Sequence, residues 1–173
     1  MATSSSKSTT KASSAKSSKK DQALGKVKSY MLWSAGAGLI PVPALDVATI
    51  IGVQMKMVAD ISDIYGVKYS ENKAKNTISA LLSGATASTF ATGTIGSGIK
   101  SIPFAGSLLG AVTMPFFASA SAYALGNVFI NHFENGGTFL DLDGDKFKAD
   151  FNVMFKKGKK AAKEVKEEAE SAE

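Results

Sequence analysis

Two long stretches of the chain carry no charged side chain. Residues 76–99 contain none, residues 101–133 contain none when His132 is counted as neutral, and only Lys100 stands between them. About 20 consecutive apolar residues cross a bilayer as a helix, and both stretches are long enough. The second is strongly apolar, whereas Ser and Thr make the transfer of the first into lipid marginal. The pattern predicts a long helical hairpin that is a candidate for membrane insertion.

An earlier apolar stretch, residues 29–55, is interrupted by Pro41 and Pro43. Proline removes a helix hydrogen bond and restrains the residue before it. We therefore expect two half-helices joined at residues 40–43, not one straight span. Asp46 follows the break, where its carboxylate can cap the second half-helix. In a bilayer this carboxylate would be costly unless it were paired or close to the surface.

An amphipathic helix is predicted directly after this pair, with Lys56, Asp60 and Asp63 on its polar face. The helical repeat of apolar residues ends at Gly66, and Gly is typical of helix C-termini. Ser70 is then suited to cap the helix that enters the hairpin. The apolar stripe of the amphipathic helix consists of Met57, Val58, Ile61, Ile64 and Tyr65.

A second amphipathic helix is predicted from about Lys146 onward. Its apolar stripe consists of Phe147, Phe151, Met154 and Phe155. A basic helix of this kind can lie on a membrane surface, but we favour packing against its own domain. Beyond Gly158 the pattern becomes charged, and we expect that end to fray into solvent.

These elements define an all-α fold, because no stretch alternates with the period of two that strands require. The order is a Pro-broken helix pair, an amphipathic helix, a long small-residue helical hairpin and a C-terminal amphipathic helix. We expect a disordered Ser/Thr/Lys-rich tail over 1–28, a helical membrane-associated domain over 29–157 and a charged helical or frayed tail over 158–173. Small residues should let the two hairpin arms approach closely: Ala85, Ala87, Ser88, Ala91, Gly106, Gly110, Ala118, Ala120 and Ala122.

The amino-acid composition limits the kinds of binding or catalytic site that the chain can form. The chain has no Cys, so it forms no disulfide and no thiolate metal site. It has one His and no Arg, which argues against multi-His metal sites and bidentate phosphate recognition. The net charge of +5 comes from lysines near the two ends of the chain, and we expect no nucleic-acid partner. The basic N-terminal tail is either a tether to anionic lipid or another polyanion, or a solubilising tail.

The segment GTIGSGIKS, residues 93–101, nearly matches a phosphate-binding loop. That motif requires Gly-Lys-Ser/Thr after a strand, whereas here Ile99 separates Gly98 from Lys100 and the preceding run is helical. We predict a helix-to-helix turn with Lys100 at its tip and Pro103 near the start of the second arm, and no nucleotide binding.

The segment FLDLDGDKFKADFN, residues 139–152, resembles a calcium-binding loop. Placing Asp141 at position 1 puts Gly144 at position 4 and Asn152 at position 12, so the EF-hand register fails. We interpret it as an Asp-rich turn that caps the following helix. His132 is more consistent with packing than with metal binding. Tyr30 and Trp33 are candidate membrane-interface anchors or core aromatics.

Lysine positions predict a topology. The N-terminal tail, the loop with Lys68, Lys73 and Lys75, and the C-terminal tail should lie on one side of a membrane under the positive-inside rule. A hairpin of 76–99 and 101–133 satisfies this with both termini in the cytoplasm. The stretch 29–55 would then be re-entrant or interfacial.

Two segments resemble a known family. GLIPVPALDVATIIGVQMKMVADISDIYG (38–66) and IKSIPFAGSLLGAVTMPFFASASAYALGNVFINHFENGGT (99–138) look like the signatures of the YcjF-type bacterial inner-membrane proteins. The resemblance implies an all-helical, membrane-associated domain of unknown activity, often found beside dynamin- or Era-like GTPases. This chain contains no GTPase domain, so a GTPase would be a separate partner.

Two functional classes follow from these patterns. The first is a non-enzymatic membrane protein of the bacterial inner membrane that scaffolds, recruits a partner, or shapes the bilayer and self-associates. The second is a soluble helical module that binds a lipid-like ligand or assembles through its apolar surfaces. We identify no catalytic, cofactor-binding or metal-binding residue and expect no cofactor.

Overall fold

The computed structural model describes residues 6–36, 47–92 and 105–171. Within them the chain forms five helices: α1 (Ser6–Gly36), α2 (Val47–Tyr65), α3 (Glu71–Thr92), α4 (Ala105–Glu134) and α5 (Gly144–Ser171). The all-α fold is confirmed.

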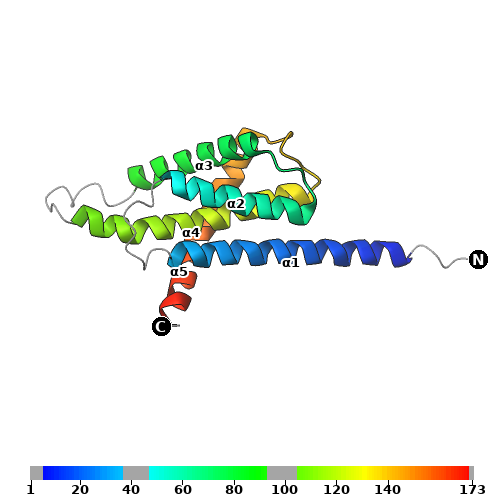
Figure 1. Ribbon diagram of the computed structural model, residues 1–173, viewed down its shortest axis with the longest axis horizontal. Coiled ribbons are helices and arrows are strands. Elements are labelled where there is room, and N and C mark those ends of the chain that lie inside the picture. Colours follow the sequence, from blue (N-terminus) through cyan, green and yellow to red (C-terminus); the bar gives the residue numbers. More distant parts are fainter. Residues whose placement is uncertain (1–5, 37–46, 93–104, 172–173) are drawn as a thin grey trace, which may run out of the picture.

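Four helices run up and down, and the fifth crosses them (Figure 1). α1 through α4 have roughly aligned axes and alternate in direction, whereas α5 passes steeply across α4 and α1. α4 is the central helix, because it packs against α5, α1 and α2. α3 lies on the outside, against α2 and α5.

Residues 6–28, for which we expected a disordered tail, belong to α1 in the structure. Ala23, Val27 and Met31 repeat every four residues, share one face of the helix and are buried. Lys20 adds an ion pair of 2.9 Å with Glu134 at the far end of α4. The folded domain therefore begins before residue 29.

The predicted pair of helices around residues 40–43 is present, since α1 ends at Gly36 and α2 begins at Val47. Pro41, Pro43 and the proposed cap Asp46 lie outside the described residues. In α2, Met57, Val58 and Ile61 are fully buried, and Ile64 and Tyr65 pack against the core. The predicted amphipathic stripe is confirmed.

Two glycines end helices with the geometry that only a residue without a side chain adopts easily. Gly66 has φ 71° and Gly136 has φ 82°. Beyond each, an amide donates back over five residues, from Val67 to Ser62 O at 2.9 Å and from Gly137 to His132 O at 2.9 Å. These bonds satisfy carbonyls that the helix ends would leave free.

Aromatic rings fill the core between α4, α5 and the connector that joins them. Phe129 is fully buried. Its ring centroid lies 5.7 Å from that of Phe133, 5.9 Å from that of Phe139 and 5.4 Å from that of Phe147. The predicted stripe of the C-terminal helix is confirmed, because Phe147, Phe151 and Phe155 are buried. The packing interpretation of α5 is correct.

The small residues of the predicted hairpin allow helices to pack closely, but the close contact is not the expected one between the two hairpin arms. Ala118, Ala120 and Ala122 of α4 are buried as predicted. However, α5 makes the close approach, where a Cβ on Gly158 would lie 2.5 Å from Ala120 O. α3 packs against α2 and α5 in the described residues. Gly106 and Gly110 lie in the part of α4 whose packing is not described.

Within the described residues, no helix is both long and apolar enough to cross a membrane. The transmembrane helices expected at 76–99 and 101–133 are not found among these residues.

The charged C-terminal segment is helical to Ser171 and does not fray at Gly158. Ala162 is buried, and Ala161 packs against the core. The folded body therefore extends past the predicted boundary at residue 157.

Candidate functional site

Four helix ends gather at one end of the bundle. Figure 1 shows that α1 and α3 end there, α2 and α4 begin there, and α4 starts beyond the ends of α1 and α2. The two connectors that join these ends, 37–46 and 93–104, each contain one charged residue, Asp46 and Lys100. We call this the low-charge end of the bundle.

Two large apolar side chains are open to solvent near the low-charge end. Trp33 is 61% exposed and Leu32 is 37% exposed, in the last turns of α1. Tyr30 is partly buried and packs against the core. The sequence could not separate the two aromatics. The structure assigns Tyr30 to the packed side and leaves Trp33 free for contact with another surface.

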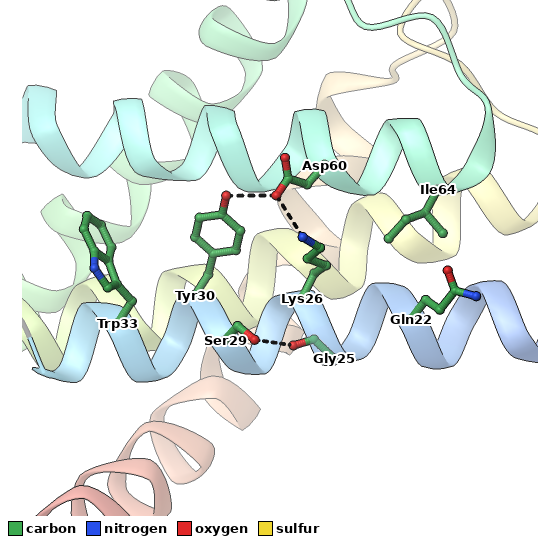
Figure 2. Close-up of a pocket in the computed structure, with 8 residues that line it drawn as sticks. All are labelled: Gln22, Gly25, Lys26, Ser29, Tyr30, Trp33, Asp60 and Ile64. Carbon is green, nitrogen blue, oxygen red and sulfur yellow. Dashed lines mark hydrogen bonds and ion pairs between the residues drawn. The ribbon is translucent and has the colours of Figure 1, made fainter.

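Trp33 stands at the edge of an open groove between α1 and α2 (Figure 2). Asp60 of α2 is the centre of its polar contacts. Tyr30 Oη donates a hydrogen bond of 3.1 Å to Asp60 Oδ2, and the Nζ atoms of Lys26 and Lys56 lie 3.5 Å from the carboxylate. The sequence placed Asp60 on the solvated face, whereas it joins α2 to α1.

The groove residues are arranged for structural contact, not for proton transfer. Burial, followed by the hydrogen bond to Asp60 and the charge of that carboxylate, raises the pKa of Tyr30 to about 12. The phenol therefore stays protonated and donates to Asp60 at neutral pH. Ser29 Oγ donates to Gly25 O of its own helix at 3.0 Å. These groups are engaged with one another and form no nucleophile-base pair.

His132 is packed at the opposite end of the bundle, where the connector between α4 and α5 lies. Its Nε2 is 2.8 Å from Thr138 O, and its ring meets that of Phe147 edge-on at 5.0 Å. Asp141 accepts from the Thr138 hydroxyl at 2.6 Å and from the Thr138 amide at 2.7 Å. These bonds, the hydroxyl first, lower the pKa of Asp141.

The Asp-rich segment acts as a helix cap. Asp143 Oδ1 accepts from the amides of Asp145 at 3.0 Å and Lys146 at 3.1 Å, so it caps α5 as predicted. In the described part of the chain, no group of three or more His, Asp or Glu residues could hold a metal ion. The segment 93–101, tested above as a phosphate loop, lies outside the described residues.

Sequence reasoning did not single out the buried polar residues, of which Gln54 bonds two helices to each other. Gln54 of α2 is fully buried, and its Nε2 donates to Ala118 O of α4 at 3.2 Å. The sequence feature that could have identified it is a single Gln on an otherwise apolar helix face. Its bond links the helices that begin at the low-charge end.

Comparisons with known proteins identify the family. The model of the domain of unknown function DUF697 matches residues 4–160, and the chain belongs to this family. Because DUF697 is the family associated with YcjF, the match confirms the resemblance drawn from the two signature segments. The family's description names no enzymatic activity.

A relative from Magnetospirillum gryphiswaldense is named magnetosome membrane protein 22. It is 35% identical over 146 residues, which cover 84% of this chain and 75% of the relative. No solved structure matches the chain significantly.

Proposed function

We propose that this protein is a non-enzymatic, membrane-associated helical module that enters one leaflet of a bilayer with its low-charge end, without crossing the bilayer. The observation that carries the proposal is the exposed Trp33, 61% open to solvent, in the last turn of α1, at the end of the bundle where α2 and α4 begin. Trp is favoured at the level of lipid headgroups because its ring is apolar and its N–H can stay hydrated.

Two further facts support the proposal. The relative from Magnetospirillum gryphiswaldense is named as a membrane protein. In addition, Lys68, Lys73 and Lys75 are exposed, and they belong to the opposite end of the bundle, where α2 ends and α3 begins. We propose the cytoplasmic face of a bacterial inner membrane, with both termini on that same side. Self-association and a separate GTPase partner stay predictions, and scaffolding or recruitment would be the role of the bound module.

Flotation of the full chain with lipid vesicles through a density gradient tests the proposal. The wild-type protein is expected to float with the vesicles. Trp33→Glu is expected to reduce the floating fraction at least about tenfold, because a charge replaces a large apolar contact. Its melting midpoint should change little, since Trp33 is largely exposed.

Leu140→Glu is the matched control. Leu140 is 85% exposed and belongs to the connector between α4 and α5, at the opposite end of the bundle (Figure 1). This variant should float like the wild type. A wild-type protein that stays at the bottom of the gradient would contradict membrane association, and equal losses in the two variants would contradict the assignment of the low-charge end.

A further inference from the structure

α5 has two opposite faces, and only one of them is used by the fold. Phe151, Phe155 and Ala162 are buried against the bundle. Lys156, Lys160 and Lys163 follow one another at spacings of 4 and 3, so they share one side of the helix, and all three are exposed. Val153, 54% exposed, precedes Lys156 by three residues on the same side. We call these four residues the basic face of α5.

The charged residues in this part of α5 are all lysines, and the nearest acids follow directly at Glu164 and Glu167. Residues 156–163 contain five lysines and no acidic residue. In the part of the chain with described side chains, no ion pair engages Lys156, Lys160 or Lys163. By contrast, Lys20 and Lys26 of α1 each face a carboxylate.

The basic face lies close to the exposed aromatic residue along the bundle. Ala161 and Glu164 of α5 line a small groove together with Met31 of α1. Met31 precedes Leu32 and Trp33 directly in the chain. In Figure 1 the C-terminal part of α5 crosses α1 near the end of α1. The lysines of α5 and the indole of Trp33 therefore lie at a similar position along the long axis of the bundle, but on different sides of the bundle.

We infer that the basic face of α5 binds the headgroups of anionic phospholipids when the low-charge end enters the bilayer. This inference rests on the proposed function and adds the lipid class. Lysines held within a Debye length of an anionic surface gain electrostatic attraction one by one. Anionic headgroups supply the negative charge that residues 156–163 lack.

Vesicle binding by the full chain tests this inference. Binding is measured to neutral phosphatidylcholine vesicles and to vesicles with about one third phosphatidylglycerol, each at low and high salt. The wild type is expected to prefer anionic vesicles, and high salt should remove the preference. The triple variant Lys156→Gln, Lys160→Gln, Lys163→Gln is expected to bind anionic vesicles about 100-fold more weakly and neutral vesicles as before.

The control variant Lys68→Gln, Lys73→Gln, Lys75→Gln removes the same charge from exposed positions at the end of the bundle where α2 ends and α3 begins. It should retain most of the anionic preference. Equal losses in the two triple variants would assign the effect to net charge and overturn the inference. Wild-type binding to both vesicle types with no anionic preference would also overturn it while leaving the proposed function intact. No wild-type binding to either vesicle type would contradict the proposed function itself.

Discussion

Replacing Phe129 with Ala is expected to lower the free energy of unfolding by about 3–5 kcal/mol, because it removes a large buried ring and leaves a cavity. The side chain is fully buried. Its ring contacts Phe139 in the connector and Phe147 in α5, with centroids 5.9 Å and 5.4 Å away. The substitution therefore loosens α4, the connector and α5 together.

Urea unfolding followed by circular dichroism measures this effect. Val153→Ala serves as the control in the same fold, because Val153 is 54% exposed and should change the stability by no more than about 0.5 kcal/mol. If Phe129→Ala unfolds at the urea concentration of the wild type, the aromatic cluster is not the core of the protein.

Gly158→Ala is expected to destabilise the protein by about 1–3 kcal/mol through overpacking, although Ala is the better helix former. The added Cβ would lie 2.5 Å from Ala120 O and 3.2 Å from Tyr123 Cβ. The first of these atoms belongs to the backbone of α4 and cannot move aside as a side chain does. α5 would have to shift away from α4.

Gly25→Ala is the matched control, since it makes the same substitution inside another helix. A Cβ at Gly25 meets no atom within 4 Å, so this variant should gain up to about 1 kcal/mol from helix propensity. The melting midpoints should move in opposite directions. A higher midpoint for Gly158→Ala would mean that α5 does not cross α4 at this glycine.

The regular parts of the fold were predictable from local patterns. The stripe from Met57 to Tyr65 and the Phe stripe of α5 each repeat with helical spacing, and each faces the core. Asp143 caps α5 because its place before the helix fixes its partners. Such features depend only on neighbours in sequence.

α1 shows why composition misleads. Lys and Ser dominate residues 1–28, which predicted disorder. The helix there is held by a narrow stripe, Ala23, Val27 and Met31, and α1 packs mainly against α4, which comes much later in the chain. A stripe of this width is too weak a signal against a polar background.

The candidate site was predictable only in part. The absence of charge in residues 76–133, with the exception of Lys100, identified the region. It could not show that α2 lies against both α3 and α4, because side-by-side packing depends on contacts between distant segments. The sequence also could not show that Tyr30 is packed while Trp33 is exposed, because this difference depends on the position of Asp60 in α2, to which Tyr30 donates a hydrogen bond.

The depth of Trp33 in a bilayer is the measurement that tests the central claim most directly. The chain has one Trp, so its fluorescence reports this position alone. On binding to vesicles, the fluorescence emission of Trp33 should shift to shorter wavelength. With lipids brominated at different depths along the acyl chain, this emission should be quenched most by the shallow bromines, as expected for an interfacial indole. A variant with Trp33→Phe and Leu140→Trp moves the reporter to the opposite end and should show neither effect. Quenching of the Leu140→Trp reporter, or an unquenched Trp33 in vesicle-bound protein, would contradict entry of the low-charge end.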